Sequence, residues 1–231
     1  AYARHRYPDL RLHLSVQNSA TTVDAIELMR EQFGIRRAVL PRVLTLAEIE
    51  KIIRQTSVEI EVFGFGSLCV MVEGRCLLSS YVTGDSPNNR GVCSPAHAVS
   101  WEEHDQVLSA RLSGNLIDQY APGEAAAYPT LCKGRFEVAG EVDYALEEPT
   151  SLNALSLLPQ LVKMGVAALK IEGRQRSPNY VGQVVSTLRT ALNAAQADPV
   201  RYSARPEWQS ALAKHAEGAQ VTQGAFERPW K

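Results

Sequence analysis

The sequence predicts an α/β protein whose parallel sheet is interrupted by a long cysteine-bearing insertion. Apolar runs typical of strands alternate with amphipathic helices, and four such strand–helix units are recognisable. All four cysteines fall between the third and the fourth of these strands. This alternation favours a parallel sheet with right-handed crossovers. An open sheet and the second half of a (β/α)8 barrel both fit, since a closed barrel needs eight strands. Residues 1–6 resemble the end of a helix and favour the half-barrel, with the cysteine-bearing insertion after its third visible strand.

The first three strand–helix units are predicted from capping residues and periodicity. Thr21 or Thr22 can cap a helix that reaches Phe33, and Gly34 ends it. Thr45 can cap a second helix, which continues to about residue 55. The strands expected around these helices cover residues 12–16, 38–40 and 58–63.

The second half of the chain begins with a stretch of weak helical periodicity and many turn residues. Short strands are expected there within residues 106–120 and 134–146. The strand–helix pattern then returns, with elements expected at residues 153–164 (helix), 167–171 (strand), 178–197 (helix) and 208–216 (helix). We therefore predict barrel units at residues 1–63, an insertion at 64–149, a final barrel unit at 150–198 and a C-terminal tail at 199–231.

Composition indicates an ordinary globular protein and no highly charged partner. The chain has 231 residues, of which 45% are hydrophobic and 21% charged, and its formal net charge is −1. No overall basic field is present, so nucleic acid is not expected as a partner. No apolar run approaches the roughly 18 residues that cross a bilayer, and the sequence does not open with a basic stretch followed by an apolar one, as a signal peptide would. We expect a cytoplasmic protein without a membrane span.

The four cysteines have the spacing Cys69-x6-Cys76-x16-Cys93-x38-Cys132. Disulfides are rare in the reducing cytoplasm, which leaves metal binding, catalysis or simple burial. A set of four cysteines suits zinc, but zinc ligands are usually paired two to four residues apart. The wider spacing favours a larger polynuclear centre. Scattered structural cysteines remain an alternative.

Four segments carry a resemblance to a known family. They are EVFGFGSLC (residues 61–69), GRCLLS (74–79), YPTLCKGR (128–135) and KIEGRQRSPNYV (170–181). These motifs resemble the signature of the collagenase-like peptidase family, U32. Within it the chain is most similar to the UbiU branch of ubiquinone-biosynthesis proteins. Phe65 stands where many members carry histidine, in agreement with that branch. Against a full-length member, roughly the first hundred residues are absent.

The resemblance implies a TIM-like barrel and a [4Fe–4S] cluster held by Cys69, Cys76, Cys93 and Cys132. UbiU-like proteins pair with a homologous UbiV-like subunit and hydroxylate quinone precursors of ubiquinone without O2. Other relatives hydroxylate RNA bases, and prephenate is the oxygen donor associated with the family. We therefore expect the iron–sulfur subunit of an O2-independent hydroxylase. The alternatives are an RNA-base hydroxylase, a peptidase and a zinc-stabilised scaffold.

Charged residues near the expected strand ends are candidates for substrate binding: Arg42, Glu61, Glu172, Arg174 and Arg176. Prephenate carries two carboxylates, and a guanidinium can bind a carboxylate through two parallel hydrogen bonds. Arg174 or Arg176, together with Arg42, could hold this donor. Alternatively, the two glutamates only neutralise these arginines. No catalytic residue is assigned, and neither His-Glu-x-x-His nor Gly-x-Ser-x-Gly is present, which weakens the peptidase alternative.

Overall fold

The computed structural model describes residues 1–218 and 220–229, which form two compact units. The first, called here the sheet unit, comprises residues 1–73 and the described residues from Thr150 onward. The second, the inserted unit, comprises residues 74–149. The insertion therefore begins ten residues later than position 64, because the segment up to Glu73 belongs with the sheet.

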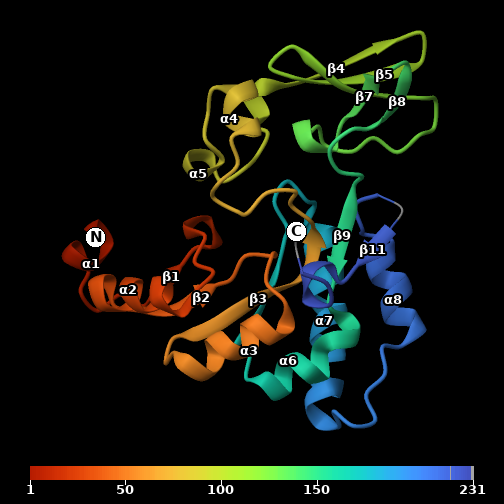
Figure 1. Cartoon of the computed structure of the whole chain (residues 1–231). Coiled ribbons are helices and arrows are strands. Elements are labelled where there is room, and N and C mark those ends of the chain that lie inside the picture. The colour runs from red at the N-terminus through yellow and green to blue at the C-terminus, as the bar shows by residue number, and fades with distance from the viewer. Residues whose placement is uncertain (219, 230–231) are drawn as a thin grey trace. The chain divides into compact units, whose positions relative to one another are not determined.

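The sheet unit alternates strands and helices along most of its length (Figure 1). Its elements are α1 (Tyr2–Arg6), β1 (Leu12–Leu14), α2 (Val23–Phe33), β2 (Ile35–Val39), α3 (Leu46–Gln55), β3 (Glu59–Ser67), β9 (Thr150–Asn153), α6 (Leu158–Met164), β10 (Ala168–Ile171), α7 (Pro178–Ala197), α8 (Pro206–Ala213) and β11 (Gln220–Thr222). Throughout the part of the chain that the structure describes, none of the helices is long and apolar enough to cross a membrane.

The strands of this unit form one open sheet. Strands β1, β2 and β3 are parallel neighbours, and β10 is parallel to β3. Strand β9 runs antiparallel to the end of β3 and is flanked by β11. The predicted mixed α/β architecture with a parallel sheet is confirmed. No closed barrel forms among residues 1–218 and 220–229, so the TIM-like barrel itself stays a prediction.

The helix boundaries follow the capping residues that the sequence predicts. The Thr22 hydroxyl accepts a hydrogen bond from the Ala25 amide, and Gly34 ends α2 in the left-handed conformation. Thr45 forms a capping box with Glu48 at the start of α3. Ser177 caps α7, which runs to Ala197 as expected.

Several predicted boundaries differ from the structure, and the two largest differences arise because tertiary pairing extends or replaces the local pattern. Strand β3 continues past Phe63 to Ser67, since β9 pairs with its last residues. Residues 150–153 form β9, and helix α6 begins only at Leu158. The four residues of β9 are too few to show a clear alternation of apolar and polar side chains.

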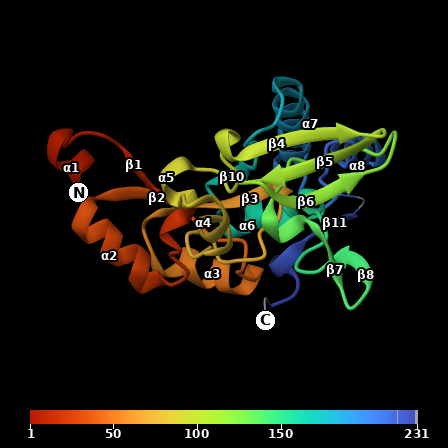
Figure 2. The ribbon, with the colours of Figure 1, turned by 90° about the horizontal axis from the view of Figure 1, so that it is seen from above.

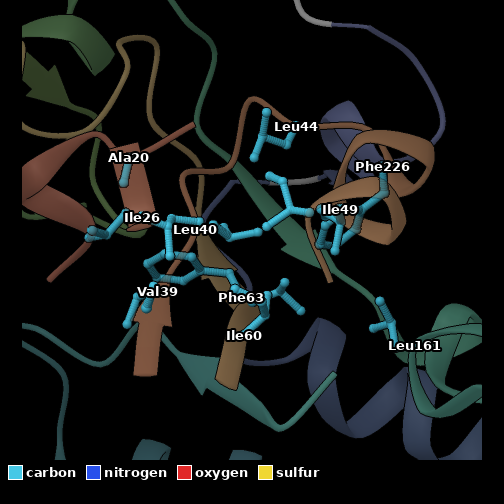
Figure 3. Packing of buried hydrophobic residues seen from close by; sticks show 14 of the residues in the cluster. Ala20, Ile26, Val39, Leu40, Leu44, Ile49, Ile60, Phe63, Leu161 and Phe226 are labelled. Atoms are coloured by element: carbon cyan, nitrogen blue, oxygen red, sulfur yellow. The ribbon is translucent and has the colours of Figure 1, made fainter. Parts of the chain in front are cut away.

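The helices cover one face of the parallel strands with an apolar core (Figure 3). Ile26 of α2, Ile49 of α3 and Leu161 of α6 belong to the same buried cluster as Ile60 of β3. A second cluster joins Phe65 to α7 and α8. Burial of such side chains contributes about 1.5 to 3 kcal/mol each, which makes this layer the main source of stability in the unit.

The opposite face of these strands carries charged side chains next to the buried Val39 and Phe63. Arg37 of β2 pairs with Glu59 (2.7 Å) and Glu61 (3.4 Å) of β3, and Arg11 reaches Glu59 at 2.5 Å. Lys170 of β10 lies beside Phe63 on the same side of the strands. Both arginines lower the pKa of Glu59 through hydrogen bonds to its carboxylate. One face of the parallel strands is thus apolar, and the other combines ion pairs with the buried Val39 and Phe63.

The inserted unit is mostly antiparallel (Figure 2). Its elements are α4 (Leu78–Thr83), α5 (Pro87–Arg90), β4 (Val99–His104), β5 (Val107–Leu112), β6 (Asn115–Tyr120), β7 (Arg135–Val138) and β8 (Glu141–Tyr144). Strands β5 to β8 fall within the two ranges predicted to contain short strands. Strand β4 lies outside them, and five of its six residues are exposed, so it lacks the apolar alternation that predicts a strand.

Two buried tyrosines, Tyr120 and Tyr180, and the partly buried Tyr202 are expected to ionise at a higher pH than an exposed tyrosine. Burial raises the pKa of Tyr120, Tyr180 and Tyr202 to about 12, and nearby Asp118 and Glu172 add to the effect at Tyr120 and Tyr180. An ultraviolet titration of tyrosinate should therefore show three of the eight tyrosines ionising near pH 12. Unfolded tyrosines ionise near pH 10, so the unfolding free energy should fall between about pH 10 and 12. Titration of all eight near pH 10 in folded protein would contradict this.

Candidate metal centre and strand-end site

Three parallel strands of the sheet unit end at one edge, and the candidate site residues follow them. Arg42 comes after β2, Cys69 after β3, and Glu172, Arg174 and Arg176 after β10. Because β3 pairs with both β2 and β10, the Cys69 segment leaves the sheet between the other two groups. This edge is where open α/β sheets place ligands.

Arg42 is largely buried and contacts several groups of the sheet unit. Its Nε donates to Glu73 Oε1 at 2.6 Å, and its Nη1 donates to the Ser67 carbonyl oxygen. Its guanidinium also lies 4.3 Å from the centroid of the Phe63 ring. Only 12% of the Arg42 side chain and 5% of the Glu73 side chain are exposed. An anionic substrate would therefore compete with Glu73 for this guanidinium.

The two glutamates among the candidate residues have other partners. Glu61 pairs with Arg37 in the sheet, as described above. Glu172 Oε1 accepts a hydrogen bond from the Arg174 amide (2.7 Å), and the Glu172 carbonyl accepts one from the Tyr180 hydroxyl (2.8 Å). Among the described residues, neither glutamate forms an ion pair with Arg42, Arg174 or Arg176. The pairing considered as an alternative to substrate binding is therefore not formed.

Arg174 and Arg176 differ from Arg42 in their surroundings. The Arg174 side chain is exposed, and its guanidinium has no ion-pair partner in the described ranges. The Arg176 guanidinium lies 5.3 Å from the centroid of the Tyr180 ring. Both cations can therefore meet an anionic ligand without breaking an internal ion pair. Their binding of an oxygen donor stays a prediction.

The three cysteines of the inserted unit lie in segments next to helix α4. Cys76 lies two residues before α4, and buried Ser79 of α4 donates a hydrogen bond to the Cys93 carbonyl oxygen. Cys132 lies in a 3-10 turn (Leu131–Lys133) that packs against α4. These three residues, far apart in sequence, thus belong to segments that contact one helix.

The segment after Cys132 is fixed by an ion pair between partly buried Arg135 and buried Asp118. Arg135 donates to Asp118 at 2.6 Å and reaches Glu124 at 2.9 Å. A Cβ atom on Gly134 would lie 2.5 Å from the Ile117 carbonyl oxygen, so the close approach of the two strands requires glycine. Sequence analysis did not single out Ser79, Glu73 or Arg135. The sequence offers one signal for each of two of them: Arg135 is the last residue of the motif 128–135, and Glu73 directly precedes the motif 74–79.

The four cysteines are divided between the two units, because Cys69 belongs to the sheet unit. All four are thiols; Cys93 is exposed, and the other three are partly buried. Within the described residues, no group of three or more His, Cys, Asp or Glu side chains is arranged to hold a metal ion. Four thiolates suit an iron–sulfur cluster or zinc by their chemistry. Binding of a metal by this set therefore stays a proposal.

A family model decides the relationship that the motifs suggested. The model described as Peptidase family U32 matches residues 1–229. The chain belongs to this family. The predicted family membership is thus confirmed. No solved structure matches the U32 chain significantly.

Several relatives of this U32 chain have names that describe hydroxylation. It is 31% identical over 209 residues to "tRNA hydroxylation protein P1" of Bacillus subtilis, covering 90% of this chain and 44% of the relative. It is 34% identical over 214 residues to "tRNA hydroxylation protein P" of Escherichia coli (84% and 46%). It is also 30% identical over 187 residues to "23S rRNA 5-hydroxycytidine C2501 synthase" of Escherichia coli (81% and 24%).

These comparisons assign the chain to the U32 family and not to a particular branch of it. It spans less than half the length of each of these three relatives. The names of these three relatives all refer to hydroxylation, and all three refer to an RNA. The narrower assignment to the UbiU branch is not shown by them.

Proposed function

We propose that this chain is part of a hydroxylation protein that uses an iron–sulfur cluster on Cys69, Cys76, Cys93 and Cys132. The observation that carries the proposal is the common strand edge, where Cys69 emerges between Arg42 and the Arg174–Arg176 segment. The names of the relatives support the reaction type. An O2-independent reaction, with prephenate as oxygen donor and a UbiV-like subunit as partner, belongs to the same proposal.

An RNA base is the first candidate substrate, on the strength of the relatives' names. The overall formal charge of −1 is the sum of a negative charge on the inserted unit and a positive charge on the rest of the chain. The inserted unit contains five Lys or Arg and eleven Asp or Glu residues, a formal charge of −6, whereas the rest of the chain contains 19 and 14, a formal charge of +5. The sheet unit therefore has a net positive charge, which supports binding of an RNA backbone by this unit.

A quinone precursor is the second candidate, favoured by Phe65. Many family members resemble one another in carrying histidine at this position. Phe65 is fully buried here and packs beside Tyr180, with ring centroids 6.4 Å apart. A residue in this core cannot bind a nucleobase directly, so the position serves packing in this chain. The presence of phenylalanine in place of histidine is in agreement with membership of the UbiU branch.

One experiment distinguishes the two substrates. Cells producing the complete gene product would be compared with cells producing Cys69→Ala, with exposed His104→Ala as the control variant. Hydroxylated nucleosides would be measured by mass spectrometry of digested tRNA and rRNA, and ubiquinone in anaerobically grown cells. We expect Cys69→Ala to abolish one hydroxylated nucleoside and leave ubiquinone unchanged. Loss of ubiquinone alone would support the second candidate, and no change in either product would contradict a hydroxylation role.

A further inference from the structure

The segment that carries Cys69 has little regular structure of its own. Strand β3 ends at Ser67 and the next helix, α4, begins at Leu78. No ladder of backbone hydrogen bonds fixes this stretch. Individual contacts at the two ends of residues 67–73 therefore contribute to the position of Cys69.

One side chain holds both of these ends. At the first end, Arg42 Nη1 donates to the carbonyl oxygen of Ser67. At the second end, Arg42 Nε donates to the Glu73 carboxylate at 2.6 Å, and the Arg42 amide approaches the other carboxylate oxygen at 3.4 Å. The guanidinium is planar and rigid, so it fixes the distance between the two groups that it binds.

Further contacts fix the same ends to the sheet unit. The Glu73 carbonyl accepts a hydrogen bond from the Ser19 hydroxyl. The Leu68 amide donates to the Thr150 carbonyl oxygen at 3.1 Å. The Ser19 hydroxyl and the Thr150 carbonyl each bind one end of the segment, whereas Arg42 binds both ends.

We propose that Arg42, through Glu73 and Ser67, is a positioning residue that presents Cys69 for cluster binding. This inference rests on the proposed function, since it assigns Arg42 to the cluster ligand rather than to an anionic substrate. A metal ligand needs partners beyond the metal to hold it in place, and removing such a partner weakens metal binding about 10- to 100-fold. Both side chains are nearly buried, so solvent screens their pairing weakly.

The test compares Arg42→Met with Arg37→Met in the complete gene product, purified without oxygen. Methionine keeps much of the aliphatic stem and removes the guanidinium in both variants. Arg37 is a matched control, because it is also a partly buried, ion-paired arginine of this sheet but does not contact residues 67–73. Cluster loss to an iron chelator would be followed by the visible absorbance of the cluster. We expect Arg42→Met to accelerate this loss about tenfold and Arg37→Met to leave it unchanged.

A second measurement does not need the cluster. In iron-free protein, alkylation of Cys69 by iodoacetamide would be timed by mass spectrometry of its peptide. We expect Arg42→Met and Glu73→Gln to accelerate alkylation of Cys69 several-fold, with Cys132 as the internal reference. Equal rates in Arg42→Met, Glu73→Gln, Arg37→Met and the unmodified protein would overturn the positioning role.

The two measurements separate the inference from the proposed function. Absence of iron in the unmodified protein, with faster alkylation in Arg42→Met, would reject the cluster and retain Arg42 as the residue that orders the Cys69 segment. Equal rates of cluster loss to the chelator in Arg42→Met and Arg37→Met would support the cluster and reject the positioning role. If Arg42→Met fails to fold, Glu73→Gln supplies both readouts, because glutamine keeps the shape of the side chain.

Discussion

Replacing Cys132 with alanine in the complete gene product should remove most of its bound iron. A [4Fe–4S] cluster needs a thiolate for each iron atom, and we propose that the chain supplies four. Protein purified without oxygen should contain about four iron and four sulfide ions per chain, and the variant less than about one of each. Metal analysis and the visible absorbance of the cluster measure both quantities. Alanine at Cys69, Cys76 or Cys93 should have the same effect, because no ligand can substitute for another.

The control for this prediction is His97→Ala. His97 is exposed and lies four residues after Cys93, so its replacement should leave the iron content unchanged. One zinc ion per chain and no sulfide would reject the iron–sulfur cluster in favour of the zinc-stabilised scaffold. Unchanged iron in Cys132→Ala would remove that residue from the ligand set.

Replacing Gly66 with alanine should severely destabilise the sheet unit. Gly66 lies near the end of β3 with a φ of +126°, a conformation that residues with a Cβ atom rarely adopt. An added Cβ atom would lie 2.5 Å from Glu172 Cβ and 3.1 Å from Glu172 Cα. These are atoms of a neighbouring chain segment whose amide is bonded to the Phe65 carbonyl, so they cannot move aside freely. We expect a loss of about 4 kcal/mol in unfolding free energy, measured by urea denaturation.

Gly165→Ala separates backbone strain from the steric clash. Gly165 ends α6 in the same unit with a φ of +88°, but an added Cβ atom there would meet only Ile53 Cγ2, at 3.8 Å. Its replacement should therefore cost about 1 to 2 kcal/mol, from backbone strain alone. Similar losses in the two variants would show that Glu172 can yield and that the close approach is not a strict constraint.

The parts of the fold that could be predicted are those with local causes. Helices α2, α3 and α7 begin at threonine or serine caps, and their apolar residues repeat with helical spacing. Strands β9 and β11 are stabilised by partners far away in the sequence, and each has only three or four residues. Their local sequence therefore contains little information about pairing.

The candidate site shows the same division between local and distant causes. The residue type and spacing of the four cysteines are visible in the sequence, and they predict a metal centre. The choice of Glu73 as the partner of Arg42 is not visible, because it depends on the path of an irregular segment. Glu61 and Glu172 were plausible partners by their position after or within strands, yet Arg37 and the Arg174 amide engage them instead.

The close pairing of β3 with β9 also bears on how the chain accommodates its insertion. Residues 74–149 leave the sheet unit shortly after Ser67 and return at Thr150, whose carbonyl oxygen accepts a hydrogen bond from Leu68. The segment that leads to the inserted unit therefore starts beside the residue at which the chain returns, and residues 69–149 form one closed loop on the sheet unit. The entropy cost of closing such a loop grows only with the logarithm of its length, by about 0.6 kcal/mol for each doubling. The junction after β3 is thus a position where the chain can lengthen, shorten or replace a whole folded unit at little cost to the sheet that carries it.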